Sequence, residues 1–219
     1  MLSQKIIKIL ILGDSGVGKS TFVHTFINGY KNNTIPMDST IGTNFESVKI
    51  NYKNTSYKLF FYDSPGQEKA KSLLNISFKE IDCFIFIYDV TKESTYNNIK
   101  EWIHFTKQAL QKYNRIFDDC TSIIITNKYD LIKEDNEKNN ILNKGKELVE
   151  ETNITAIICS SILDLDGFTP QYGIQCLMDE YTKNKNNNDI ISRNPENNKI
   201  ELSKIIKIEN NDNCACISQ

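Results

Sequence analysis

The sequence has little excess of either charge and no long apolar stretch. Its 219 residues include 26 lysines and arginines against 28 aspartates and glutamates, a formal net charge of −2 at pH 7. This near balance argues against a function driven by charge, such as nucleic-acid binding. No run approaches the roughly 18–20 consecutive apolar residues of a membrane-spanning helix, so any contact with a membrane is expected to come through attachment.

The common cysteine and histidine motifs are also absent. Of the 6 cysteines, those before residue 200 are scattered among apolar segments, without a C-x-x-C pair or histidines at metal-ligand spacing. We expect them to be buried thiols in a reducing compartment. His24 and His104 lie in helical patterns and are expected to be structural. Because Leu2 occupies the position where myristoylation needs glycine and no cleavage site follows, we expect neither myristoylation nor a signal peptide.

Short apolar runs alternate with helical patterns up to about residue 183. The strand-like runs are rich in Ile, Phe and Tyr, as expected for strands covered on both faces: Ile6–Leu12, Phe45–Ile50, Tyr57–Tyr62, Cys83–Tyr88, Ser122–Thr126 and Thr155–Cys159. The helical patterns are Lys19–Ile27, Lys69–Phe78, Glu93–Tyr113, Lys138–Glu151 and Pro170–Tyr181. In the third of them, Trp102 is expected to be a packing residue.

This alternation predicts an α/β fold with a six-stranded, mostly parallel sheet and helices on both faces. The second and third runs are too close for a crossover helix, and Asn51–Asn54 supplies turn residues, so this pair is predicted to form an antiparallel hairpin at the sheet edge. We predict one domain over residues 5–182 and a flexible tail over 183–219, where ten asparagines lie between Asn184 and Asn213. The apolar patch at Ile200–Ile208 is either a short partner-binding strip or a chance fluctuation.

A phosphate-binding loop follows the first strand. Residues Gly13–Ser20 read G-D-S-G-V-G-K-S, and an apolar helix opens directly after them. Glycines allow successive backbone N–H groups to point at a polyphosphate, and the helix adds the positive end of its dipole. Lys19 can reach the β- and γ-phosphate oxygens, and Ser20 can bind Mg²⁺. The expected ligand contacts are Ser15, Gly16, Val17, Gly18, Lys19, Ser20 and Thr21.

The loop alone predicts a nucleoside triphosphate, and the base is indicated by a second motif. Asn127-Lys128-Tyr129-Asp130 follows a buried strand, at the edge where open α/β sheets bind ligands. The Asp130 carboxylate can accept both the N1–H and the exocyclic amine of guanine. Adenine lacks this pair of donors and would leave the carboxylate unpaired. Asn127, Lys128 and Asp130 are therefore expected to bind guanine.

Two segments between these motifs have the residues for metal binding and hydrolysis. Asp63-Ser64-Pro65-Gly66-Gln67-Glu68 follows the third strand. Asp63 can hold Mg²⁺ through water, the Gly66 N–H can bond the γ-phosphate, and Gln67 can orient the attacking water. Upstream, Ser39-Thr40-Ile41-Gly42 offers a hydroxyl and a carbonyl for the same ion, although this tetrapeptide by itself carries little information.

Taken together, these motifs resemble the Ras superfamily of small GTPases, and the Rab family most. The resemblance covers about residues 5–182 and includes S-T-I-G at 39–42, G-Q-E at 66–68 and Y-D-V-T at 88–91. It implies that Thr40 senses Mg²⁺ and the γ-phosphate, that Gln67 is the hydrolytic glutamine, and that Ser160 and Ser161 contact guanine.

The resemblance also implies a function. It implies a monomeric GTP/GDP switch in vesicle traffic, located on the cytoplasmic face of intracellular membranes with a cytosolic pool. The expected partners are an exchange factor, a GTPase-activating protein, a lipid-masking escort and effectors.

The chain departs from the Rab pattern in its switch segments. Pro65 replaces the usual alanine, Tyr62 the usual tryptophan and Ser77 the usual tyrosine, while Lys69-Ala70 replaces Arg-Phe and Ser160-Ser161-Ile162 lacks the expected lysine. The two arginines, Arg115 and Arg193, lie outside the switches. We therefore expect slow intrinsic hydrolysis that an activating protein's arginine accelerates. The alternative is a guanine-nucleotide-binding scaffold with little or no hydrolysis.

The chain finishes with Cys214-Ala215-Cys216-Ile217-Ser218-Gln219. The Rab resemblance implies a double geranylgeranyl modification at C-x-C, and the final four residues also fit a loose C-a-a-X box. One lipid chain binds membranes only marginally, and the charges of residues 183–219 nearly balance. We therefore expect both Cys214 and Cys216 to carry lipid, with two unmodified thiols as the alternative.

Overall fold

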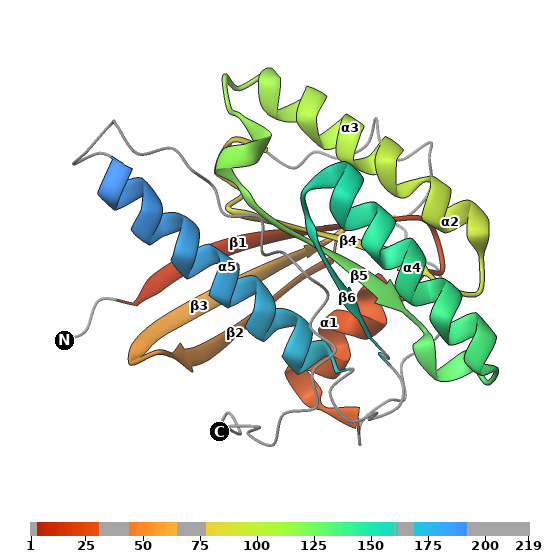
Figure 1. The fold of residues 1–219 in the computed structure, drawn as a ribbon. Coiled ribbons are helices and arrows are strands. Elements are labelled where there is room, and N and C mark those ends of the chain that lie inside the picture. Colours follow the sequence, from red (N-terminus) through yellow and green to blue (C-terminus); the bar gives the residue numbers. More distant parts are fainter. Residues whose placement is uncertain (1–3, 31–43, 65–77, 160, 162–168, 192–219) are drawn as a thin grey trace.

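The computed structural model describes residues 4–30, 44–64, 78–159, 161 and 169–191. They form a six-stranded sheet in the order β2-β3-β1-β4-β5-β6 (Figure 1). The strands are β1 (Lys5–Leu12), β2 (Asn44–Tyr52), β3 (Thr55–Asp63), β4 (Cys83–Asp89), β5 (Thr121–Asn127) and β6 (Thr155–Ile158). Every pairing is parallel except that between β2 and β3, which confirms the predicted α/β sheet with an antiparallel edge hairpin.

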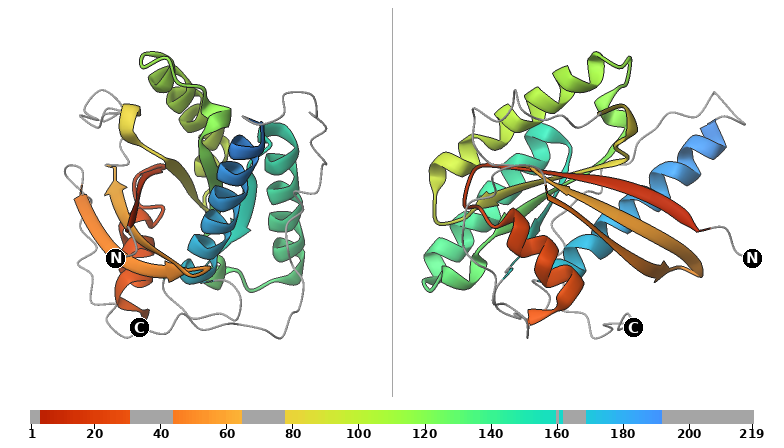
Figure 2. Two further views of the ribbon diagram at one scale, coloured as in Figure 1. Left: turned by 90° about the vertical axis from the view of Figure 1, so that its left-hand side faces the viewer. Right: turned by 180° about the vertical axis from the view of Figure 1, so that it is seen from behind.

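The helices lie between the strands in the sequence, except for α5, which follows β6. They are α1 (Lys19–Asn28), α2 (Glu93–Asn97), α3 (Ile99–Gln111), α4 (Asp135–Thr152) and α5 (Pro170–Ile191), with the short 3₁₀ turns η3 (Phe78–Glu80), η4 (Phe117–Asp119) and η5 (Tyr129–Leu131). The β2–β3 hairpin lies at one edge of the sheet and α4 lies at the other (Figure 2).

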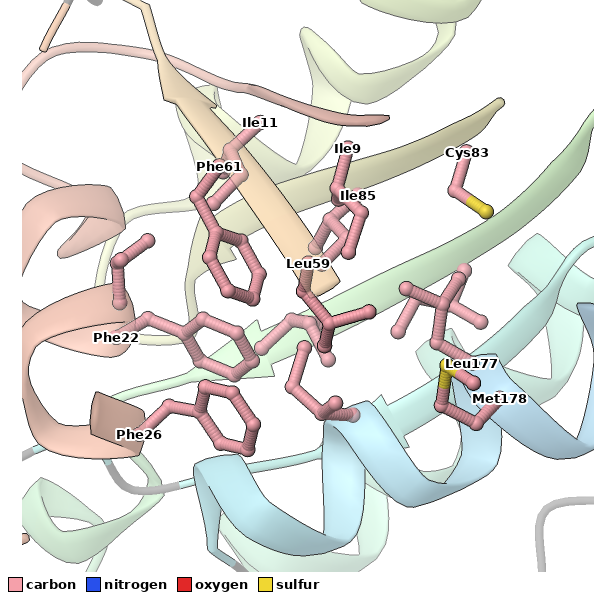
Figure 3. Close-up of a cluster of buried hydrophobic side chains, with 14 of the residues drawn as sticks. Ile9, Ile11, Phe22, Phe26, Leu59, Phe61, Cys83, Ile85, Leu177 and Met178 are labelled. Atoms are coloured by element: carbon pink, nitrogen blue, oxygen red, sulfur yellow. The ribbon is translucent and has the colours of Figure 1, made fainter. Parts of the chain in front are cut away.

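The sheet separates two hydrophobic clusters, because successive strand residues point to opposite faces. On β1, Ile9 and Ile11 pack with residues of α1 and α5, including Phe22 (Figure 3). Leu10 and Leu12 belong to the other cluster, which includes Trp102 of α3 and Leu148 of α4. Both faces of the central strands are therefore buried, and this explains why their sequences do not alternate between apolar and polar residues.

The hairpin turn is tighter than the sequence suggested. We expected a turn over Asn51–Asn54, but Asn51 and Tyr52 still pair with Ser56 and Thr55. Only Lys53 and Asn54 form the turn, with φ angles of 44° and 61°. Two consecutive residues with positive φ match the right-handed twist of the flanking strands, so the ladder can extend up to the turn.

The helices differ from the sequence expectation in two places. The single pattern over Glu93–Tyr113 divides into α2 and α3 at Asn98, whose backbone N–H bonds back to Ser94 and Tyr96. Helix α5 continues to Ile191, past residue 182 where we expected the domain to end. The helix predicted at Lys69–Phe78 lies outside the described residues except for Phe78, which is in η3.

Candidate functional site

The predicted phosphate loop joins the end of β1 to the start of α1, and a side chain would clash at two of its glycines, Gly13 and Gly18. A Cβ at Gly13 would lie 2.1 Å from the Ile87 carbonyl oxygen, and one at Gly18 would lie 2.4 Å from Asn127 Nδ2. Gly18 also has a φ of 99°, a conformation that side chains disfavour. The loop can therefore follow this path only with glycine at both positions.

Lys19 lies inside this loop, where its side chain is only 6% exposed. Its Nζ donates hydrogen bonds to the carbonyl oxygens of Gly13 (3.0 Å) and Asp14 (2.8 Å). Burial lowers the pKa of Lys19 to about 8, although the charges of Asp63 and Asp14 oppose the change. Among the described residues, this buried ammonium group has two carbonyl partners for its three N–H donors, so the site favours an anion.

Ser20 and Asp63 form the part of the site that fits Mg²⁺. Ser20 Oγ donates a 2.5 Å hydrogen bond to Asp63 Oδ2. Asp63 is 4% exposed, and within the described part of the chain its Oδ1 is buried without a hydrogen-bond partner. Burial raises the pKa of this carboxyl, while Ser20 and Lys19 act in the opposite direction.

An unpaired buried carboxylate oxygen is costly, and a divalent cation would remove that cost. No group of three His, Cys, Asp or Glu side chains forms a metal site among residues 4–30, 44–64, 78–159, 161 and 169–191. A cation here would therefore complete its oxygen shell with the Ser20 hydroxyl, water and ligand phosphates, as Mg²⁺ commonly does.

The Asn127–Asp130 motif supports the phosphate loop from the end of β5. Asn127 Nδ2 donates to the Val17 carbonyl oxygen at 2.8 Å, and Ser161 Oγ donates to Asn127 Oδ1 at 2.9 Å. Lys128, which has a φ of 65°, donates from Nζ to the Gly16 carbonyl oxygen at 2.7 Å. In the structure, Asn127 and Lys128 thus hold the loop, and Ser161 holds Asn127.

The remaining loop and base residues lie around this framework. Ser15 and Gly16 are exposed at the tip of the loop, whereas Val17 is buried, and Thr21 follows on α1. Asp130 lies in η5, directly after the residues that hold the loop, and is partly exposed. Asp130 is two residues from Lys128, which contacts the loop, and its binding of the base stays a prediction.

Several residues that hold the site were not predicted from the sequence. Asp89, at the end of β4, is 1% exposed and accepts a hydrogen bond from Lys128 Nζ at 2.7 Å. Burial alone would raise its pKa, but hydrogen bonds from Lys128 and Thr91 outweigh burial and lower it. Ser64 Oγ donates to the Ile11 carbonyl oxygen at 2.7 Å and fixes the end of β3. The Y-D-V-T motif at 88–91 contained Asp89, but its partner is 39 residues away and spacing could not identify it.

Trp102 has both the expected role and a second one. It is 1% exposed and belongs to the cluster on the α3 face, as a packing residue should. Its Nε1 also donates to Asp14 Oδ1 in the phosphate loop at 2.8 Å.

Three aromatic rings cluster on the β2–β3 hairpin, at Phe45, Phe60 and Tyr62. Phe45 is 54% exposed, and its ring lies 5.3 Å from that of Phe60 and 5.4 Å from that of Tyr62.

Several predicted site residues lie outside the described residues: Thr40, Gly66, Gln67, Ser160, Cys214 and Cys216. None of the helices in the described ranges is both long and apolar enough to cross a bilayer.

Comparison with known proteins identifies the family. The model described as "Ras family" matches residues 8–165, which include the phosphate loop, Asp63 and the Asn127–Asp130 motif. The chain belongs to the Ras family.

Among curated Ras-family relatives, the chain is similar to several Rab proteins. It is 34% identical to mouse "Ras-related protein Rab-22A" over 49% of this chain and 54% of that protein. It is 33% identical to beet "Ras-related protein RAB1BV" over 68% of this chain and 65% of that protein. It is 32% identical to Arabidopsis thaliana "Ras-related protein RABC2b" over 70% of both chains. The chain thus spans about half of the length of the mouse protein and about two-thirds of the length of the beet protein. These similarities confirm the Rab resemblance of the sequence.

Proposed function

We propose that this chain binds GTP and GDP together with Mg²⁺ and acts as a molecular switch. The observation that carries the proposal is the pair of Ser20 and Asp63 beside Lys19, in which Asp63 Oδ1 is buried and has no hydrogen-bond partner among the described residues. The ion would be held by Ser20 and, through water, by Asp63, and when bound it would neutralise charge on the β- and γ-phosphates. Lys19 and the loop amides would hold the phosphates, and Asp130 would select guanine.

Hydrolysis belongs to the same proposal. Gln67 would orient the attacking water, and Thr40 and Gly66 would respond to the γ-phosphate. We infer a slow intrinsic rate, because Arg115 Nη1 is engaged with the carbonyl oxygens of Phe78 and Ile81, and the other arginine, Arg193, lies outside the switch segments in the sequence. An activating protein's arginine would then raise the rate by about 10³–10⁵-fold.

The cellular role that we propose is regulation of vesicle traffic. The Rab relatives support this role, with an exchange factor, an activating protein, an escort and effectors as partners. The effectors would bind near Phe45, Phe60 and Tyr62, because this exposed aromatic surface adjoins the switch segments.

The lipid attachment proposed at Cys214 and Cys216 would hold the chain on the cytoplasmic face of membranes. Intact-mass analysis of the protein from its native cell tests it, and an unmodified mass in the membrane fraction would contradict it.

A scaffold that binds guanine nucleotide without hydrolysis is the second candidate. Pro65 favours it, because a fixed φ stiffens the segment that must move with the γ-phosphate. Single-turnover assays with GTP and with ATP, on the wild type and on Gln67→Leu, separate the two functions. The switch predicts slow GTP turnover that the substitution reduces further. Equal and negligible GTP turnover in both proteins supports the scaffold, and turnover of ATP contradicts both.

A further inference from the structure

Asp14, the second residue of the phosphate loop, is held by two side chains of the α2–α3 segment. Asn98 Nδ2 donates to Asp14 Oδ2 at 2.7 Å, and Trp102 Nε1 donates to Asp14 Oδ1 at 2.8 Å. Each carboxylate oxygen therefore has its own donor. The two donors are four residues apart, so they lie on the same face of the helical segment one turn from each other.

The donors are themselves fixed in place. Trp102 is 1% exposed, and its ring meets that of Phe105 edge-on at 6.1 Å. Its backbone N–H bonds to the Asn98 carbonyl oxygen at 3.0 Å, which ties one donor to the other. A packed, hydrogen-bonded pair of this kind loses little further rotamer freedom when it binds the carboxylate.

Asp14 also takes part in the phosphate site through its backbone. The Asp14 backbone carbonyl accepts the 2.8 Å hydrogen bond from Lys19 Nζ. Asp14 therefore connects the lysine that faces the phosphates to a helix outside the loop. The hydrogen bonds from Asn98 and Trp102 also have an electrostatic consequence. A carboxylate turned toward the bound phosphates would repel them, whereas the Asp14 carboxylate is directed to these neutral donors.

We propose that Asn98 and Trp102 are positioning residues of the phosphate site. By holding the Asp14 carboxylate, they fix the loop in the shape that receives the phosphates and thereby slow nucleotide release. The proposal rests on the guanine-nucleotide binding proposed above. A purely structural role for the same contacts would lower thermal stability without a specific effect on release.

An exchange of the two polar side chains tests the proposal. Asn98→Asp places two carboxylates opposite each other, and we expect GDP release to accelerate at least tenfold, which corresponds to about 1.4 kcal/mol of repulsion between like charges at this distance. Asp14→Asn combined with Asn98→Asp restores the pairing, because the amide introduced at position 14 can donate to the carboxylate introduced at position 98 and still accept from Trp102. The double variant should release GDP within about threefold of the wild type, as a compensated pair does in a double-mutant cycle.

The measurement is the dissociation rate of a fluorescent GDP analogue in excess Mg²⁺ and unlabelled GDP, with the melting temperature recorded for each variant. Trp102→Phe keeps a buried ring but removes the donor, and should also accelerate release. Lys100→Ala, which removes an exposed side chain on the same helix, is the control. If Asn98→Asp does not fold, the GDP release rates of Trp102→Phe and of the double variant, each compared with the wild type, test the proposal.

Unchanged release in folded Asn98→Asp or Trp102→Phe would overturn the proposal, as would a well-folded double variant that releases GDP as fast as Asn98→Asp. If the wild type binds no GDP at all, the proposed function itself has failed, and this outcome is distinct from the others.

Discussion

Replacing the buried Lys19 should reveal how much stability the nucleotide-free protein loses by keeping a charge in its phosphate loop. Burial lowers the pKa of Lys19 from 10.5 to about 8. Since one pKa unit corresponds to about 1.4 kcal/mol, the charged side chain destabilises the fold by about 3 kcal/mol at neutral pH. Lys19→Met removes this charge while keeping much of the apolar stem.

The pH dependence isolates this contribution. Below pH 8 the lysine is protonated in both the folded and the unfolded chain, so the destabilisation is fully present. Between pH 8 and 10.5 the folded protein releases its proton while the unfolded chain keeps it, so the stability of the wild type rises with pH. Methionine does not titrate. The stability of Lys19→Met relative to the wild type should therefore fall by about 3 kcal/mol between about pH 7 and pH 10.5.

Urea unfolding of nucleotide-free protein at a series of pH values measures this difference. Loss of the hydrogen bonds to Gly13 and Asp14 shifts the difference at every pH and does not change its slope. Lys49→Met, which removes a lysine from an exposed position of β2, is the matched control. A difference between Lys19→Met and the wild type that stays constant from about pH 7 to pH 10.5 would refute the reasoning.

Three further substitutions test other parts of the site. Mg²⁺ should raise the GDP affinity of Asp63→Ala by a factor at least ten times smaller than in the wild type, because a charged ligand of the ion is lost. An Mg²⁺ titration of GDP affinity that is unchanged from the wild type would contradict the assignment of Asp63 to the ion. Asp130→Asn should reduce GTP affinity by about 10–200-fold and favour xanthosine triphosphate, whose C2 oxygen accepts where guanine donates; retained GTP affinity in competition binding would exclude Asp130 as the base contact. Arg115→Met should lower the free energy of unfolding by about 2 kcal/mol in urea, since the carbonyls of Phe78 and Ile81 lose a charged donor; an unchanged unfolding midpoint would show that this anchor is unimportant.

The strands and the glycine-rich loop between β1 and α1 could be predicted because their signals are local. Buried parallel strands appear as continuous apolar runs, and the glycines of the phosphate loop, Lys19 and Ser20 are fixed by spacing within one segment. The side chains that hold the site could not be predicted in this way. Asp14 and Trp102 are 88 residues apart in the chain, and Lys128 and Gly16 are 112 residues apart. Only the fold brings these pairs together.

The C-terminal end of α5 could not be predicted from the sequence for a different reason. Asparagine is a poor helix former, so the Asn-rich sequence after Lys183 favoured a flexible segment. In the structure the helix continues, and two of its side chains have partners, one on β5 and one within the helix. Asn184 Nδ2 donates to Thr121 Oγ1 at 3.2 Å, and the Lys185 ammonium lies 5.6 Å from the centre of the Tyr181 ring. Contacts with the sheet can override weak local propensity, and composition alone does not reveal them.

Isothermal titration calorimetry with GDP, GTP and ATP in Mg²⁺ buffer would show whether this chain is a guanine-nucleotide-binding protein. We expect one site per chain for each guanine nucleotide, tight binding that weakens when Mg²⁺ is removed, and no measurable heat with ATP. Folded protein that gives no heat with either guanine nucleotide, or that binds ATP equally well, would contradict it.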